Sequence, residues 1–236
     1  MLLALDTATE WVHLALLGGQ AIWTKRVLTS PSSSASGVLL PSIDELLQDA
    51  DSRRQDIFGV AACIGPGGFT SLRVGIATAE GLGVSGLQTW GFSAFELRAH
   101  ALKMNGHEYS GIACLVLDGK RGEVFMQPWD LGELQAVAPA MKIPLPELQT
   151  AIGDRQWWTL ERFYDQATAH VSSPPITLKE EGRATLGALA NLGRVCSARP
   201  AEAQLFPYYL RETDAEINFP QASVHLSEAH RRGLPR

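Results

Sequence analysis

The sequence predicts an α/β protein made of two related halves. Each half opens with strand-like segments joined by a glycine-containing turn, over residues 2–28 and again over 112–129, and helical periodicity appears later in each. A third sign is the glycine-rich turn Gly65-Pro66-Gly67-Gly68, which lies between the apolar run 58–64 and a helix of small residues. With 236 residues, 45% of them hydrophobic, the chain can bury the core of one large or two small domains.

The first half begins with three predicted strands. Residues 2–5 are continuously apolar, 12–17 and 21–28 alternate, and Gly18-Gly19 is a turn signal between the last two, which together predict an antiparallel meander. The next apolar segment has helical spacing, with Pro41 expected in or near its first turn. The elements predicted after the meander are a helix at 38–49, a strand at 58–64, a helix at 70–84, a strand at 87–90 and a helix at 94–103.

The second half repeats this start and then loses its regularity. Strands are predicted at 112–117 and 123–129 around the turn 118–122, and a helix at 180–195, while prolines break the sequence between them into short pieces. These patterns predict an N-terminal domain at 1–106, a diverged second copy of the same unit at 107–211, and a flexible polar tail at 212–236.

Composition limits the function classes. A net charge of −5 argues against a protein that holds nucleic acid by itself. Cys63, Cys114 and Cys196 lack metal-site spacing, so they predict buried free thiols in a reducing compartment, and no metal site is expected. The N-terminus reaches Asp6 too early for a signal peptide, and no apolar run approaches the ~20 residues of a membrane span. A cytoplasmic protein without membrane contact is expected.

The glycine-rich turn does not match a nucleotide motif. A Walker A loop ends in Gly-Lys-Ser/Thr, whereas this turn continues as Gly68-Phe69-Thr70, and the third glycine of a dinucleotide fingerprint is missing. Thr70 is expected to cap the following helix. Asp6 follows a buried strand, where RNase H-like and actin-like folds hold a metal- or phosphate-bridging carboxylate, but no set of converging carboxylates accompanies it. An N-cap or turn role is predicted for Asp6. The only candidates for cofactor contact are Asp6, Thr7, Gly67 and Gly68, and no catalytic residue is identified.

Two helices of the first half have faces that could contact a partner. Gly75, Ala79 and Gly83 recur every fourth residue and form a smooth groove, which either receives another backbone or packs on the chain's own sheet. The leucine pairs 39–40 and 46–47 widen the apolar face of the earlier helix, which favours a protein–protein patch. Lys120-Arg121 with Arg73 forms either a small basic site or only a solvated hairpin turn.

Five segments together resemble a known family. The most specific is residues 65–75, GPGGFTSLRVG, and the others are 3–10 (LALDTATE), 39–47 (LLPSIDELL), 117–125 (LDGKRGEVF) and 207–211 (PYYLR). They resemble the bacterial TsaB (YeaZ) family. The resemblance implies an actin-like ATPase fold of two RNase H-like domains, each with a mixed sheet flanked by helices. It also implies a role in making threonylcarbamoyladenosine next to the anticodon of tRNAs that read codons beginning with A.

The resemblance further implies a non-catalytic scaffold that binds and activates the catalytic subunit TsaD, is joined by the ATPase TsaE, meets tRNA through the complex, and forms a homodimer when alone. ATP would be used by the complex, with no cofactor held tightly by this chain. The first two helices would form the interface, through Leu39, Leu40, Ile43, Leu47, Leu72, Arg73, Ile76 and Ala79. Ala79→Arg is therefore expected to block the heterodimer without unfolding the chain.

The chain departs from the family pattern at Ala35, where many members have a histidine, at Gly68-Phe69-Thr70-Ser71, where Ser-Phe-Thr-Gly is usual, and throughout the sequence after residue 130. Two alternatives remain open. One is an enzyme with its own ATP site, either a glycoprotease-like peptidase or a sugar-kinase-like ATPase, and the other is an unrelated regulatory homodimer.

Overall fold

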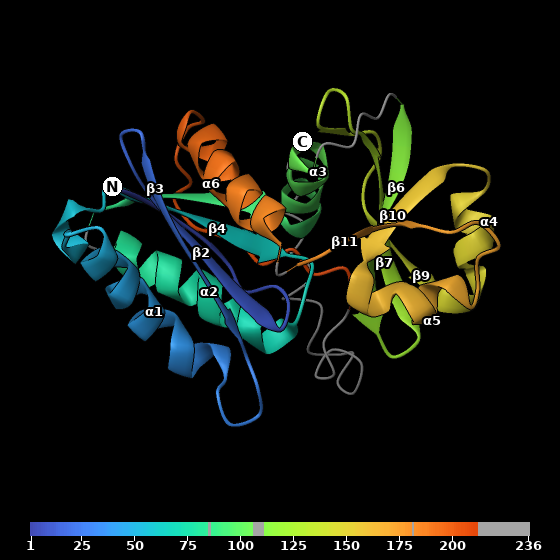
Figure 1. The fold of residues 1–236 in the computed structure, drawn as a ribbon, viewed down its shortest axis with the longest axis horizontal. Coiled ribbons are helices and arrows are strands. Elements are labelled where there is room, and N and C mark those ends of the chain that lie inside the picture. The colour runs from blue at the N-terminus through green and yellow to red at the C-terminus, as the bar shows by residue number, and fades with distance from the viewer. Residues whose placement is uncertain (85, 106–110, 181, 212–236) are drawn as a thin grey trace, which may run out of the picture.

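The computed structural model contains two mixed β-sheets with helices between and around them (Figure 1). It describes residues 1–84, 86–105, 111–180 and 182–211. The predicted domain boundary at residue 106 falls at the edge of a gap in this description and stays a prediction, and the predicted tail 212–236 lies outside the described residues. No helix in these ranges is long and apolar enough to cross a membrane.

The first sheet has the strand order β3-β2-β1-β4-β5. The predicted meander is confirmed, because β1 (Leu2–Asp6), β2 (Trp11–Gly18) and β3 (Ala21–Leu28) pair antiparallel in sequence order. On the other side of β1, β4 (Gly59–Gly65) and β5 (Gln88–Ser93) continue the sheet in parallel. The parallel strands β1 and β4 are buried almost throughout, as their continuous apolar runs predict.

Both faces of this sheet are covered. Helices α1 (Ala35–Asp49) and α2 (Phe69–Gly83) lie side by side on one face, and α6 (Arg183–Ser197) covers the other, with α3 (Ala94–Met104) against α6 (Figure 1). Successive side chains of β1 point to opposite faces of the sheet, so β1 contacts the helices on both faces. A Cβ at Gly75 of α2 would lie 3.3 Å from Leu5, and one at Gly193 of α6 would lie 3.1 Å from Ala4.

The second sheet repeats the strand order of the first, which supports the predicted duplication. Its first two strands, β6 (Ile112–Lys120) and β7 (Glu123–Asp130), form the predicted hairpin, and β10 (Gln156–Leu160) and β11 (Ile176–Leu178) add in parallel beyond β6. The remaining pieces are short: β8 (Gln135–Ala136), β9 (Met141–Pro144), α4 (Leu148–Ile152), α5 (Tyr164–Thr168) and the 3-10 turns Arg54–Asp56, Leu145–Glu147 and Glu161–Phe163.

One hydrophobic core extends through both halves. Along β6, Leu115 and Leu117 belong to the core that contains the first sheet, whereas Cys114 and Val116 face a smaller core under α4 and α5. The three cysteines are buried free thiols, as predicted. The burial raises the pKa of the Cys196 thiol to about 12 and that of Cys63 well above its usual value, so neither is reactive at neutral pH.

The end of the described chain returns to the first sheet. After α6, the indole N–H of Trp90 donates to the Arg199 carbonyl (3.0 Å), the Glu202 amide donates to the Thr89 carbonyl (2.8 Å), and the Tyr208 amide donates to the Ile64 carbonyl (2.7 Å). We call residues 198–211 the strap. Although the strap and α6 belong to the second half of the sequence, they pack on the first sheet.

Three helix predictions need correction. The first helix begins at Ala35 rather than near residue 38, so Pro41 lies in its interior. Thr70 is not a cap, because α2 begins at Phe69 and its N-cap is Gly68, without a side-chain hydrogen bond. The last helix begins at Arg183 instead of residue 180, which leaves Glu180 in the connection before it.

The smooth groove of α2 packs on the protein's own sheet, so its interpretation as a docking groove is wrong. A Cβ at Gly75 would lie 2.3 Å from the Thr7 hydroxyl oxygen, and one at Gly83 would lie 3.0 Å from the Thr89 methyl. Ala79 between them is fully buried. The small residues let α2 approach β1 and β5 closely.

Gly75→Ala is predicted to destabilise the protein by about 1–3 kcal/mol, the usual cost of overpacking. The added methyl would displace the Thr7 hydroxyl, which donates to the Ser71 carbonyl (2.8 Å). Chemical unfolding monitored by circular dichroism measures the change. Gly81→Ala is the control on the same helix, because a Cβ there meets nothing within 4 Å. It should leave stability unchanged or raise it by about 0.5–1 kcal/mol through helix propensity. Equal effects of the two substitutions would contradict this packing.

Candidate functional site

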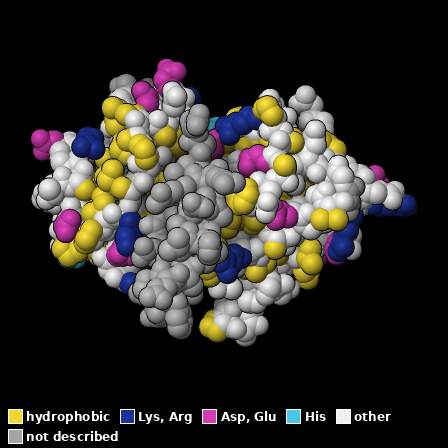
Figure 2. Space-filling model, turned by 180° about the vertical axis from the view of Figure 1, so that it is seen from behind, with side chains coloured by type: hydrophobic (Ala, Val, Ile, Leu, Met, Phe, Trp, Pro, Cys, Tyr) yellow, Lys and Arg dark blue, Asp and Glu magenta, His cyan; other side chains and the backbone are white. Residues whose placement is uncertain are grey.

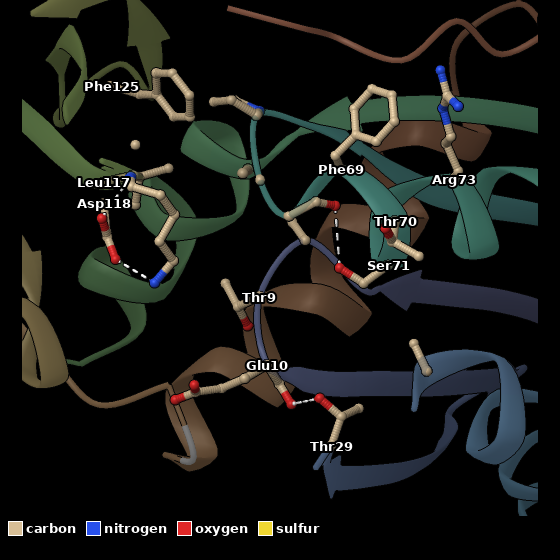
Figure 3. Close-up of a pocket in the computed structure, with 18 of the residues that line it drawn as sticks. Thr9, Glu10, Thr29, Phe69, Thr70, Ser71, Arg73, Leu117, Asp118 and Phe125 are labelled. Carbon is tan, nitrogen blue, oxygen red and sulfur yellow. Dashed lines mark hydrogen bonds and ion pairs between the residues drawn. The ribbon is translucent and has the colours of Figure 1, made fainter. Parts of the chain in front are cut away.

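A cleft of about 910 Å3 lies between the two halves. The first half contributes the turn 8–10 after β1 and the segment 66–71 at the start of α2, and the second contributes the hairpin 117–120. The end of the strap, residues 208–211, completes the wall. In Figure 3, Leu117 and Asp118 lie across the cleft from Thr70 and Ser71.

The two turns at the bottom of the cleft are bonded to each other. The Gly68 amide donates to the Ala8 carbonyl (2.7 Å), and the Thr7 hydroxyl donates to the Ser71 carbonyl (2.8 Å). Gly67 is needed for this approach, because a Cβ there would lie 2.3 Å from the Ala8 oxygen. The structure therefore brings three of the four candidate cofactor residues, Thr7, Gly67 and Gly68, together where the two turns contact each other, with Gly67 and Gly68 exposed in the cleft.

Asp6, the fourth candidate, ends β1 and is fully buried. One carboxylate oxygen accepts from the Ala8 amide (2.9 Å), which confirms the predicted turn role, and the other accepts from the Arg98 guanidinium of α3 (2.9 Å). Burial alone would raise the pKa of Asp6. The charge of Arg98, with smaller contributions from His13 and the Ala8 amide, instead holds that pKa well below its usual value. Asp6 is therefore an ionised internal partner of Arg98.

The ion pair continues toward the second half. Arg98 also donates to the Glu180 carboxylate (3.0 Å), whose other oxygen lies 2.6 Å from the Arg162 guanidinium. Arg162 in turn lies 3.3 Å from the Glu10 carboxylate. We call Asp6, Arg98, Glu180 and Arg162 the ion chain.

The charges of the ion chain alternate, so each is compensated inside the protein. The Asp6, Arg98 and Glu180 side chains are 0%, 3% and 2% exposed. Burial acts to lower the pKa of Arg98, but Asp6 and Glu180 raise it, so the guanidinium remains charged. His13 closes the group from β2, with one ring nitrogen 3.0 Å from the Glu180 carbonyl and the other 3.7 Å from Asp6.

The upper wall of the cleft is aromatic and basic. The Arg73 guanidinium lies 3.8 Å from the centre of the Phe69 ring and donates to the Tyr209 hydroxyl (2.7 Å), and the two rings stack at 5.1 Å. Lys120 is paired with Asp118 at 2.5 Å. Arg73 and Lys120 line the same cleft, whereas Lys120 and Arg121 also form a hairpin turn with positive φ angles of 62° and 56°.

Known proteins resemble the chain over most of its length. A sequence model of TsaD, described as tRNA N6-adenosine threonylcarbamoyltransferase, matches residues 32–142. The tRNA threonylcarbamoyladenosine biosynthesis protein TsaB of Bacillus subtilis (strain 168) is 23% identical over 236 residues, covering 92% of this chain and 97% of that protein. The protein of the same name from Haemophilus influenzae is 34% identical over 106 residues, covering 41% of this chain and 44% of that one. The solved structure of YeaZ from Pseudomonas aeruginosa matches with a TM-score of 0.70 and 21% identity, covering 89% of this chain and 99% of that chain.

These similarities support assignment of the chain to the TsaB (YeaZ) family. The two mixed sheets, each flanked by helices, confirm the fold class that the sequence resemblance implied. The match to YeaZ spans both halves, so it includes the region after residue 130, where the sequence pattern had been lost.

Six of the eight residues expected at the TsaB-family interface are buried within the protein, so the side-chain assignment was wrong for them. They face the first sheet because they are the apolar side of each helix: Leu39, Ile43, Leu47, Leu72, Ile76 and Ala79 are 0–5% exposed. Leu40 is 46% exposed and Arg73 is also exposed, so these two remain available to a partner.

Several residues that complete the site carry little signal in the sequence. Arg98 is a lone arginine between the buried Leu97 and Ala99, and a charge in such a run is a signal for an internal ion pair. Glu180 and Arg162 carry no comparable signal, because they lie in connections. Tyr209 lies in a segment quoted for the family resemblance, yet its contact with Arg73, 136 residues earlier, could not be read from the sequence.

Asp6→Asn is predicted to lower the free energy of unfolding at neutral pH by about 3–5 kcal/mol, because it leaves Arg98 with one compensating carboxylate. The pKa of Asp6 is depressed in the folded state, so the stabilisation is present above the ordinary value of 3.8 and is lost as pH falls below it. Unfolding curves at several pH values should therefore converge for the two proteins in acid.

The matched control is Asp44→Asn. Asp44 accepts two hydrogen bonds from Arg54 (2.7 and 2.6 Å), but on the surface. Its loss should cost about 1 kcal/mol or less. A cost for Asp6→Asn no greater than for this control would show that the buried carboxylate is not what stabilises the site.

Proposed function

We propose that this TsaB-family chain is a non-catalytic subunit in threonylcarbamoyladenosine synthesis on tRNA, and that it binds and activates a TsaD-like catalytic subunit. The relatives are named for this pathway. The observation that carries the non-catalytic role is the hydrogen bond between the two cleft turns, from the Gly68 amide to the Ala8 carbonyl. A phosphate site at these turns would need backbone N–H groups that point to the ligand, and this N–H is used internally.

The state of Asp6 supports the same proposal. A carboxylate that bridges a metal or a nucleotide must present its oxygen atoms to the cleft. Both oxygens of Asp6 instead accept hydrogen bonds from Ala8 and Arg98, and the side chain is fully buried. Opening this position would leave Arg98 and Glu180 in an unbalanced buried cluster, which is costly.

The proposed docking surface is the outer face of α1 and α2, opposite the sheet. On α2, Arg73, Ala77 and Gly81 recur every fourth residue and are exposed. On α1, Gly37 and Leu40 are exposed, and the two helices are neighbours (Figure 1). The small side chains at 77 and 81 would let a partner helix approach closely, and Leu40 would supply apolar contact.

The TsaD match supports a pairing of like helices. Residues 32–142, which match the TsaD sequence model, include both α1 and α2. A TsaD-like partner would therefore present comparable helices, and a second copy of this chain could use the same face when that partner is absent.

The remaining parts of the proposal concern the complex. A TsaE-like ATPase would join it, and the ATP would be used there rather than held tightly by this chain. Contact with tRNA through the complex agrees with the charge of the chain, which is −5 overall. On the face shown in Figure 2, the described basic side chains are scattered among acidic and apolar ones.

Ala77→Arg is predicted to raise the Kd for a TsaD-like subunit at least tenfold, since a long charged side chain would separate the helices at a cost above about 1.4 kcal/mol. The midpoint of unfolding should not change, because residue 77 is exposed. Titration of the purified proteins, followed by size-exclusion chromatography with light scattering, measures both the affinity and the stoichiometry.

Two further variants separate an effect on docking from an effect of the added charge or of unfolding. Gln166→Arg adds the same side chain to an exposed position of α5 and should leave the complex intact. Ala79→Arg, first expected to act at the interface, should instead unfold the chain because its position is fully buried. A complex of normal affinity with Ala77→Arg would exclude this face as the docking surface.

The isolated full chain is predicted to show no binding of Mg-ATP in the micromolar range by calorimetry, because the Gly68 N–H is already bonded to the Ala8 carbonyl and both oxygens of Asp6 are engaged inside the protein. The same titration into the complex with the TsaD-like subunit is the positive control. Micromolar binding by the chain alone, or hydrolysis without a partner, would instead support an enzyme with its own ATP site.

A further inference from the structure

Two cations in the wall of the cleft have no carboxylate partner among the described residues. Arg73 contacts two uncharged groups, the Tyr209 hydroxyl and the Phe69 ring, and Arg211 donates to the Gly119 carbonyl (3.3 Å). The other cations that line the cleft are each paired with a carboxylate: Arg98, Arg162 and Lys120. A guanidinium has five N–H donors, so Arg73 and Arg211 can each bind an anion without giving up these contacts.

The same cleft has an apolar floor. Four apolar side chains line it, three from the second sheet and one from the strap: Leu117, Phe125, Leu160 and Leu210. Figure 3 shows the Phe125 ring directed toward the open space above Leu117. The volume of about 910 Å3 falls within the range of about 300–1,000 Å3 that ligand pockets span. An inorganic ion would leave the floor in water, whereas an organic ligand would cover it, so the floor favours an organic ligand.

The end of the strap brings the charged and apolar parts of the cleft close together. The Tyr209 hydroxyl holds the Arg73 guanidinium on the α2 wall, Leu210 lines the cleft, and Arg211 is bonded to the hairpin on the other wall. These three strap residues are consecutive, and consecutive Cα atoms lie only about 3.8 Å apart. One compact ligand can therefore contact both kinds of surface.

A nucleoside triphosphate matches this chemistry poorly. The Gly68 amide and both oxygens of Asp6, which a phosphate or metal site at the turns would need, are used inside the protein. Glu10 and Asp118 also line the cleft, so a ligand with several negative charges would meet repulsion there. A ligand with a single anionic group is the better match to the two arginines.

We propose that the cleft binds a small organic anion with an apolar body. The carboxylate or phosphate of this ligand pairs with Arg73 and Arg211, and the apolar body covers Leu117, Phe125 and Leu210. The inference goes beyond the proposed function, because it concerns the cleft and not the docking of a partner on the outer face of α1 and α2.

The fluorescent probe anilinonaphthalene sulfonate tests the proposal on the full chain. It joins one sulfonate to an apolar ring system, so its fluorescence should increase on titration and saturate at one site per chain. N-phenylnaphthylamine has the same rings without the sulfonate and should bind at least about fivefold more weakly, as expected for the loss of an exposed ion pair. Added salt should weaken binding of the charged probe more than binding of the neutral one.

Backbone amide NMR signals locate the site. The signals of Ser71, Gly119 and Leu210 in the cleft walls should shift on addition of anilinonaphthalene sulfonate, and the shifts should saturate with the Kd obtained from fluorescence. The signal of Gln166, on the exposed surface of α5, is the reference and should not shift.

Charge variants show which cations bind the anionic group. Arg73→Gln and Arg211→Gln should each raise the Kd of anilinonaphthalene sulfonate about fivefold. Arg194→Gln is the matched control, because Arg194 is exposed on α6 and does not line the cleft, and it should leave the Kd unchanged. Circular dichroism verifies that all three variants are folded during the titration.

Competition identifies the anionic group of the ligand. Phenylbutyrate and phenyl phosphate should displace the probe, and the one that acts at the lower concentration assigns a carboxylate or a phosphate ester to the site. Phenylbutanol, which has the same apolar body as phenylbutyrate and no charge, should not displace the probe at these concentrations.

Three results would overturn the proposal. The first is the absence of saturable probe binding or of shifts in the cleft signals, and the second is a Kd that Arg73→Gln and Arg211→Gln leave as unchanged as Arg194→Gln does. The third is displacement of the probe by micromolar Mg-ATP, which would make the cleft a nucleotide site. Binding to the TsaD-like subunit is measured separately with Ala77→Arg, so its failure would not be confused with any of these.

Discussion

The guanidinium of Arg98 determines what the centre of this protein can do. It lies between a carboxylate that ends the first strand of the first sheet, Asp6, and one that follows the last strand of the second, Glu180. All three charges are almost fully withdrawn from water, and a buried charge is tolerated only when it is paired. The pairing therefore joins the two halves at the position where an ATPase of this fold would need an accessible acid. The side chains that remain accessible for binding lie outside the ion chain, for example Phe69 and Arg73 in the wall of the cleft.

The regular part of the fold could be predicted from the sequence, because local patterns are sufficient for it. The meander of β1–β3, the β6–β7 hairpin and the helix after the glycine turn each have a clear period and clear turn residues. The region after residue 130 could not be predicted, since its strands are short and owe their existence to distant partners. Gln156, for example, pairs with Ala113 of β6, which no local pattern encodes.

The candidate site was harder to predict. Sequence periodicity shows which residues share one face of a helix, but it does not show which part of the protein that face contacts. Helix α2 has one row of small residues at 75, 79 and 83 and another at 77 and 81, and either could have faced the sheet. The close fit of Gly75 to Thr7 decided between them. The partners of Arg98 are likewise 92 and 82 residues away in the sequence, so its role depends on a fold that must already be known.

Arg73 links the outer face of α2 to the cleft. It begins the exposed row of α2 that continues with Ala77 and Gly81, and it also lines the cleft, where its guanidinium lies against Phe69 and the Tyr209 hydroxyl. A partner on the outer face that drew this guanidinium away from the cleft would break its hydrogen bond to the Tyr209 hydroxyl. Because Tyr209 is part of the strap that ends in the cleft, occupancy of the two surfaces would then be coupled through one side chain, and by thermodynamic linkage the coupling would act equally in both directions.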